Sequence, residues 1–215
     1  MENGKELDHK FVIVIGRQYG SGGRRIGKML AKELGVTYYD KTLLKEAASK
    51  MGYSTDIFER KDERRPSLIR SILSFTYGAN TANIDGAPMS DEKIYEFQSR
   101  VIREICERES CVIVGRTADY VMRHHPNLVS VFVHAPLSHR ASVIMQRENV
   151  ENLAEASELA ERHDRNREEF YNYYTNRNGW GRAHNYHLSF DASRITDEAI
   201  VCAVKAMLPP NLLKS

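Results

Sequence analysis

The sequence predicts an α/β protein with a doubly wound parallel β-sheet and helices on both faces. Two observations support this fold class. Short apolar runs without polar alternation recur along the 215 residues, as expected for strands that are buried on both faces. Segments with apolar residues at helical spacing separate these runs, and such alternation of strands and helices gives a parallel, right-handed arrangement.

The expected strands are short and apolar. The first, Phe11–Ile15, is a continuous run rich in β-branched residues, and a glycine-rich loop follows it. The others are expected at Val36–Tyr39, Cys111–Val114, Val129–Val133 and Tyr186–Phe190.

The expected helices lie between and after these strands. The first places its apolar residues on one face and ends at Gly35, and Asp40 is expected to cap the second. The helices are expected at Arg25–Leu34, Lys41–Lys50, Ser67–Tyr77, Ser90–Ile105, Thr117–Arg123, Leu137–Arg147, Leu153–Thr175 and Thr196–Met207.

No part of the chain has the composition of a linker, so we expect one domain over residues 1–215. Residues 52–90 are less regular and include the charge run Glu59–Arg65. No role is assigned to the arginines of this stretch, which are Arg64, Arg65 and Arg70.

Composition excludes several classes of protein. The 31 Lys and Arg residues against 29 Asp and Glu give a net charge of +2, which argues against a dedicated nucleic-acid binder. The apolar runs are far shorter than the roughly 20 residues that cross a bilayer, so no membrane association is expected. Met1–Lys10 lacks the apolar core of a secretion signal, and the three cysteines form no C-x-x-C. A reducing, cytoplasmic location is therefore expected.

The glycine-rich loop after the first strand is the place where α/β proteins bind phosphate. The dinucleotide pattern G-x-G-x-x-G fails, because Arg25 stands where the third glycine belongs. The pattern G-x-x-x-x-G-K-[ST] is not met literally either. Arg17 falls on its first glycine, Gly23 on its lysine and Arg24 on its Ser/Thr.

Two arginines, Arg24 and Arg25, stand at the start of the following helix. Positive side chains there oppose the helix dipole unless an anion lies between them. This cost favours phosphate binding over the alternative, in which the glycines serve only a tight turn and the arginines a solvated first turn.

Four ordered segments resemble the bacterial cytidylate kinase-like proteins, a divergent branch of the P-loop nucleoside monophosphate kinases. The segments are GRQYGSGGRRIGKMLAKELGVTYYDKTLL, CVIVGRTADYV, RHDRNREEFYNYYTNRNGWG and NYHLSFDASRI, and the resemblance runs from about Phe11 to Met207. It implies a P-loop NTPase fold with a helical lid at residues 148–183 and a helical acceptor-side insertion at residues 52–90. Cytidylate kinases move the γ-phosphoryl group of ATP to CMP or dCMP with Mg²⁺, so nucleotides are the implied partners.

The resemblance also implies roles for individual residues. A phosphate loop would cradle the donor, and it comprises Gly20, Ser21, Gly22, Gly23, Arg24 and Arg25. The acceptor would contact Asp40, Lys41 and Arg116. The lid would supply the catalytic residues Arg162, Asp164, Arg165 and Arg167, of which Asp164 would orient an arginine or accept a proton. No residue is assigned to the metal.

The sequence departs from the cytidylate kinases at two places. Gly23 and Arg24 replace the loop lysine and the small or hydroxyl residue after it, and no acidic residue adjoins Gly115-Arg116. Arg24 or Arg25 would have to supply the missing charge, although an arginine's planar fork differs from a lysine's point charge. Two alternatives therefore stay open: a nucleotide-binding sensor or regulatory protein without turnover, and a P-loop kinase for a non-pyrimidine acceptor. On charge pattern alone, the lid arginines also fit a surface helix held by ion pairs.

Overall fold

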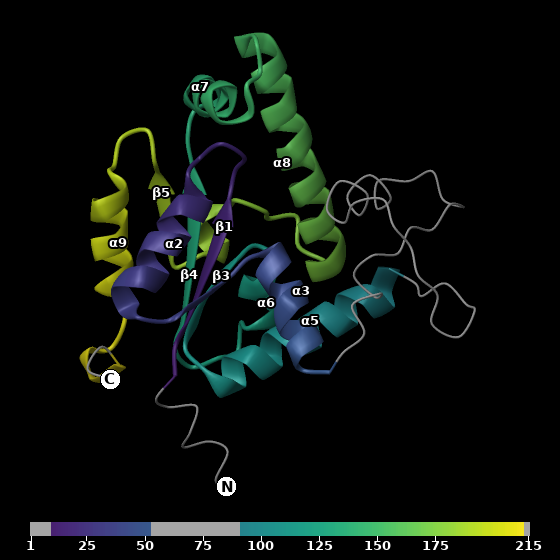
Figure 1. Ribbon diagram of the computed structural model, residues 1–215, viewed down its shortest axis with the longest axis vertical. Helices are drawn as coiled ribbons and strands as arrows, with labels where there is room; N and C mark the ends of the chain where they lie inside the picture. The colour runs from purple at the N-terminus through teal and green to yellow at the C-terminus, as the bar shows by residue number, and fades with distance from the viewer. Residues whose placement is uncertain (1–9, 53–90, 213–215) are drawn as a thin grey trace, which may run out of the picture.

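The computed structural model describes residues 10–52 and 91–212. Within these ranges, five parallel strands form one sheet in the order β2-β3-β1-β4-β5 (Figure 1). They are β1 (Val12–Arg17), β2 (Thr37–Tyr39), β3 (Cys111–Val114), β4 (Leu128–His134) and β5 (Leu188–Asp191). The expected helix at Ser67–Tyr77, the charge run Glu59–Arg65 and the arginines at positions 64, 65 and 70 lie outside the described residues.

Helices follow the strands along the chain. They are α2 (Gly23–Leu34), α3 (Lys41–Lys50), α5 (Asp91–Arg108), α6 (Ala118–Val121), α7 (Leu137–Glu148), α8 (Leu153–Thr175) and α9 (Asp197–Lys205). Short 3₁₀ turns occupy Ala183–Asn185 and Pro210–Leu212. No helix within residues 10–52 and 91–212 is long and apolar enough to cross a membrane.

The central strand β1 is buried on both faces, which explains its continuous apolar sequence. Ile13 and Ile15 pack with α2 and α9, whereas Val12 and Val14 pack with α3, α5 and α6. Alternate residues of one strand therefore contribute to two cores, and Figure 1 shows the corresponding helices on opposite sides of the sheet. The expected doubly wound parallel sheet is confirmed.

The carboxyl end of the sheet is uneven. β1 pairs with β3 only as far as Ile15 and Val114, but it pairs with β4 through Gly16 and Arg17. β1 thus extends beyond the end of β3, so the side chain of Arg17 has space over the carboxyl end of β3. Because β1 lies between strands reached by crossovers in opposite directions, this edge is where open α/β sheets bind ligands.

The helices α7 and α8 pack against each other beside this edge, at the upper end of Figure 1. Their contact is made by small residues and one isoleucine, namely Ala141, Ile144, Ala156 and Ala160. The close packing brings α8 next to the loop between β1 and α2.

The sequence predicts most element bounds to within a few residues, and Cys111–Val114, Lys41–Lys50 and Leu153–Thr175 match in full. The main differences lie at the carboxyl edge. β1 continues through Gly16 and Arg17, because both residues pair with β4. β5 begins at Leu188 rather than Tyr186, because a 3₁₀ turn at Ala183–Asn185 precedes it.

Candidate functional site

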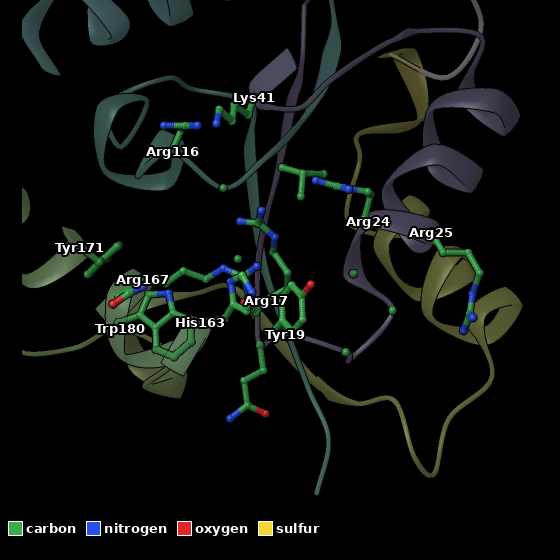
Figure 2. Close-up of a pocket in the computed structure, with 18 of the residues that line it drawn as sticks. Arg17, Tyr19, Arg24, Arg25, Lys41, Arg116, His163, Arg167, Tyr171 and Trp180 are labelled. Carbon is green, nitrogen blue, oxygen red and sulfur yellow. The ribbon is translucent and has the colours of Figure 1, made fainter. Parts of the chain in front are cut away.

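A cavity of about 870 Å³ opens at the carboxyl ends of the central strands. Its walls are the β1–α2 loop, the turn after β3 and the inner face of α8 (Figure 2). Both its position and its size suit a small-molecule ligand.

The β1–α2 loop has the backbone of an anion cradle. Gly20 has φ +82°, and a Cβ there would lie 2.7 Å from the carbonyl oxygen of Arg140, so only glycine fits. Gly22 has φ +86° and precedes α2, which has no side-chain cap hydrogen bond. The N–H of Arg25 already donates to the Gly22 carbonyl oxygen at 2.8 Å, so among the described residues it is the N–H groups of Gly23 and Arg24 that this helix start offers to a ligand.

Both backbone polar groups of Tyr19 tie the β1–α2 loop to neighbouring helices. The Tyr19 N–H donates to Asp164 Oδ1 of α8 at 2.7 Å, and the Tyr19 carbonyl oxygen accepts from Arg140 Nη1 of α7 at 3.0 Å. Arg140 Nη1 also pairs with Asp164 Oδ2 at 2.8 Å, and Arg140 Nε donates to the Ala135 carbonyl oxygen at 2.9 Å. One ion pair therefore fixes the loop to both helices.

This ion pair is buried. The side chains of Arg140 and Asp164 are 7% and 12% exposed. Burial raises the pKa of Asp164, and the Tyr19 N–H and the arginines beside it oppose this rise. The oxygens of Asp164 accept hydrogen bonds from the Tyr19 N–H and from the guanidinium groups of Arg140 and Arg167, and its predicted catalytic role, proton acceptance included, stays a prediction.

Six arginines line the cavity among the described residues, and four of them, Arg17, Arg24, Arg116 and Arg167, are close enough to repel one another around Arg17. In Figure 2 the side chain of Arg17 lies at the centre, between the other three. Burial, followed by repulsion from those three arginines, lowers the pKa of Arg17 well below its usual range. Burial likewise lowers the pKa of Arg167 to about 10. Such a cluster concentrates positive potential where a polyanion would bind.

The turn after β3 is held in an uncommon conformation. Gly115, Arg116 and Thr117 have φ of +80°, +65° and +51° in succession. The left-handed region costs a non-glycine residue about 1 kcal/mol or more, and a β-branched threonine is rarely found there. The Thr117 hydroxyl contacts Tyr95 Oη at 2.9 Å, which helps to hold the turn. Strain of this kind is typical of residues that position a ligand.

Two of the three residues predicted to contact an acceptor lie at another part of the cavity wall. Lys41 and Arg116 line it, and Figure 2 shows their side chains extending toward each other. Asp40 caps α3, because its Oδ1 accepts from the N–H groups of Thr42 and Leu43 at 3.0 and 3.3 Å. Its other oxygen lies 3.6 Å from Arg24 Nε, so Asp40 also orients an arginine of the loop.

Several predicted site residues do not reach the cavity with their charged groups. Arg162 and Arg165 lie on the exposed side of α8, and Arg165 is 4.0 Å from Glu161. Arg167 faces the cavity because it follows His163 by one helical turn on the inner face. Of the three arginines predicted to belong to a lid, only Arg167 lines the cavity.

Two loop residues are also engaged elsewhere. The guanidinium group of Arg25 pairs with Asp197 of α9, away from the centre of the cavity (Figure 2). The Ser21 hydroxyl contacts the carbonyl oxygens of Gln18 and Val133, each at 2.9 Å. The predicted phosphate contacts of these two side chains stay predictions, and the geometry gives them other partners.

Sequence analysis assigned no site role to Arg17, Tyr19, Arg140 and His163. The Tyr19 and His163 rings stack at 3.8 Å with an interplanar angle of 9°, and burial lowers the pKa of His163 to about 4. His163 is therefore neutral near pH 7. A sequence signal existed for Arg17 alone, since it occupies a glycine position of the loop pattern.

Asp119 lies buried at the floor of the cavity. Its Oδ2 accepts from the Tyr171 hydroxyl at 2.9 Å, which links α6 to α8. Burial raises the pKa of Asp119 to about 6. Its protonation state therefore changes near neutral pH, beside the ligand site.

The described residues offer no cluster of protein ligands for Mg²⁺, a cation that kinases hold largely through the nucleotide phosphates with one or two protein groups. Within residues 10–52 and 91–212, no three His, Cys, Asp or Glu residues are grouped as metal ligands. The position of the metal-binding hydroxyl in the loop pattern holds Arg24, and the hydroxyl of Ser21 is engaged. No step of the chemistry is therefore assigned to a metal.

Comparison with known proteins agrees with this geometry. Residues 12–194 match the model of the cytidylate kinase-like family. No curated protein matches the sequence. Among solved structures, an uncharacterized protein from Eubacterium ventriosum ATCC 27560 is similar, with a TM-score of 0.65, 24% identity, and coverage of 92% of this chain and 99% of that one. A gluconokinase from Sinorhizobium meliloti 1021 has a TM-score of 0.50 and 16% identity, over 93% of this chain and 92% of that one. The fold is therefore that of the P-loop kinases.

The buried ion pair can be tested by Asp164→Asn. The amide oxygen can still accept from Tyr19, but Arg140 is left buried without a counter-charge, which costs about 3–5 kcal/mol in the free energy of unfolding. Glu161→Gln on the same helix breaks an exposed pair and is expected to cost less than about 1 kcal/mol. Urea unfolding measures the free energy of unfolding of both variants. Equal losses in the two variants would contradict the role of the Arg140–Asp164 ion pair in holding the loop.

The raised pKa of Asp119 predicts a dependence of stability on pH. Because the folded state holds this proton more tightly than the unfolded chain, whose aspartate pKa is about 3.9, stability falls as pH rises through about 6. The wild type should lose about 1–3 kcal/mol relative to Asp119→Asn between about pH 4 and 7. Urea unfolding of both proteins at several pH values measures this loss. A constant difference across that range would show that Asp119 titrates normally.

Proposed function

The chain belongs to the cytidylate kinase-like family, and on this premise we propose that it is a phosphotransferase. It moves the γ-phosphoryl group of ATP to CMP, dCMP or a similar small phosphorylated acceptor. The observation that carries the proposal is the convergence of four arginines on a glycine-rich loop at the end of a parallel sheet. Phosphoryl transfer requires charge neutralisation and alignment more than covalent catalysis, and arginines supply both.

The donor would bind at the β1–α2 loop. The N–H groups at the start of α2, together with Gly22, form a cradle for its phosphates. Arg167 lies beside this loop, where it donates to the Arg17 carbonyl oxygen at 3.3 Å and faces the Tyr19 ring at 5.1 Å. Its guanidinium group is therefore placed to neutralise charge on the transferring phosphoryl group.

The acceptor would bind at the end of the cavity that holds Arg116 and Lys41. In the reaction, an oxygen of the acceptor phosphate forms a bond to the γ-phosphorus. The bond from this phosphorus to the β–γ bridging oxygen breaks, and its electron pair leaves with ADP. The products from CMP are CDP and ADP. The strained turn at Arg116 supports this assignment, because the strain holds the side chain toward the cavity.

Family membership implies ATP as the donor, usually accompanied by Mg²⁺. Because the described residues supply no ligand set for the metal, neutralisation in this proposal comes from the arginines.

A second candidate function is nucleotide binding without turnover, as in a sensor or regulatory protein. The observation that favours it is Gly23 at the position of the loop lysine. The two functions differ in one measurement, which is ADP release from ATP and Mg²⁺ with CMP, dCMP, UMP, AMP or no acceptor. ADP release that depends on an acceptor supports the kinase and identifies the class of its acceptor. ADP release with AMP but not with CMP, dCMP or UMP would indicate a non-pyrimidine acceptor. ATP binding without ADP release in any arm supports the sensor.

The acceptor site is tested by Arg116→Gly. Glycine adopts φ +65° without strain, so the free energy of unfolding should stay equal or rise by up to about 1 kcal/mol. The acceptor KM should rise at least about tenfold, the effect of losing one charge-assisted hydrogen bond.

The matched control is Asn176→Gly, which relieves a φ of +50° at the end of α8. Its KM should equal that of the wild type. An unchanged acceptor KM in Arg116→Gly would remove Arg116 from the acceptor site.

A further inference from the structure

Arg17 is held at the centre of the cavity by two glycines. It is the last residue of β1, and it extends beyond the paired end of β3. The guanidinium group lies against Gly115, where an added Cβ would collide with Arg17 Nη1. The stem lies against Gly23, where a Cβ would be 2.6 Å from Arg17 Cβ and 3.1 Å from Arg17 Cγ.

The contact with Gly23 has a direct consequence for the loop pattern. Position 23 is where the pattern G-x-x-x-x-G-K-[ST] has its lysine, and any side chain there would collide with the stem of Arg17. Position 17 is where the same pattern has its first glycine. The two departures are therefore spatially complementary, because the arginine occupies the space that a lysine side chain at position 23 needs.

The electrostatics of Arg17 require an anion. Within residues 10–52 and 91–212, no carboxylate forms an ion pair with its guanidinium group. Repulsion from Arg167, Arg24 and Arg116 lowers its pKa, whereas the nearby carboxylate of Asp164 is already held by Tyr19 and Arg140. A buried cation among like charges is unfavourable unless a ligand neutralises it.

We propose that Arg17 replaces the loop lysine and binds the β- and γ-phosphates of the donor nucleotide. This inference rests on the proposed function, because it takes a nucleoside triphosphate as the ligand of the loop. The charge reaches the phosphates from β1 rather than from α2. A planar guanidinium group can donate to two phosphate oxygens at once, whereas a lysine presents a single point charge.

The first test is ATP affinity of Arg17→Met, measured by calorimetry. Methionine keeps a stem of similar shape and removes the charge. The expected result is ATP binding weakened about tenfold to hundredfold, the effect of losing charge-assisted hydrogen bonds. Stability without ligand should rise, because three repulsions are relieved. A structural role alone would lower stability and leave ATP affinity unchanged, and that result would overturn the proposal.

The second test relocates the charge. Gly23→Lys alone should weaken ATP binding, because the lysine collides with Arg17. Arg17→Gly alone should weaken it through loss of charge. The double variant Arg17→Gly/Gly23→Lys also removes the Cβ of position 17 that meets a Cβ at position 23, and it returns a cation to the loop, so it should bind ATP at least about tenfold more tightly than Arg17→Gly. A double variant that binds ATP no better than Arg17→Gly would show that the two positions do not exchange the charge.

The matched control is Arg108→Ala, which removes an exposed arginine at the end of α5 and should leave ATP affinity unchanged. Failure of the two proposals can be told apart. A wild type that binds no ATP overturns both. A wild type that binds ATP as tightly as Arg17→Met overturns the role of Arg17 alone. ATP binding that depends on Arg17, without ADP release for any acceptor, supports Arg17 and overturns the kinase.

Discussion

The buried ion pair between Arg140 and Asp164 is the contact on which the site depends. It holds the N–H and the carbonyl group of Tyr19, and with them the β1–α2 loop, against α7 and α8. The same carboxylate lies 3.4 Å from Arg167 Nη1, so the pair also helps to keep Arg167 beside Arg17 although the two guanidinium groups repel each other. In many P-loop kinases a lid closes only on the ligand. Here the inner face of α8 is already joined to the loop.

A second constraint follows from this arrangement. Four guanidinium groups are held near one another, and the pKa values of Arg17 and Arg167 are lowered as a result of burial and repulsion. The turn at Arg116 and Thr117 adds backbone strain. Both features lower the stability of the ligand-free protein. A bound polyanion would neutralise the repulsion among the guanidinium groups, and the turn would present Arg116 to that polyanion. Natural binding sites commonly show this opposition between stability and function.

The sequence predicts the fold well, because β1 and β3 are unbroken apolar runs, Gly35 marks the end of α2 and Asp40 the start of α3. It predicts the site less completely. The role of Arg140 could not be predicted, because the sequence does not distinguish a buried arginine on the inward face of a helix from an exposed one. The lid arginines have the predicted spacing, but the rotation of α8 is set by small residues such as Ala156 and Ala160, which give a weak apolar stripe. The orientation of Arg167, as against Arg162 and Arg165, therefore becomes clear only in three dimensions. The sequence shows two separate departures from the loop pattern, Arg17 at its first glycine and Gly23 at its lysine. Only the structure shows that the two positions are in contact, with the side chain of Arg17 packed against Gly23.

The account centres on a cavity built for the phosphates of its ligand rather than for a base. The most direct measurement is thermal unfolding of the wild type with inorganic tripolyphosphate or with adenosine. A ligand that binds the folded state raises Tm, and the stabilisation grows with the logarithm of the ratio of free ligand concentration to Kd. Tripolyphosphate should raise Tm, and adenosine at the same concentration should have a much smaller effect. A rise with adenosine and none with tripolyphosphate would contradict the account, because the four arginines would then have no anion to neutralise them.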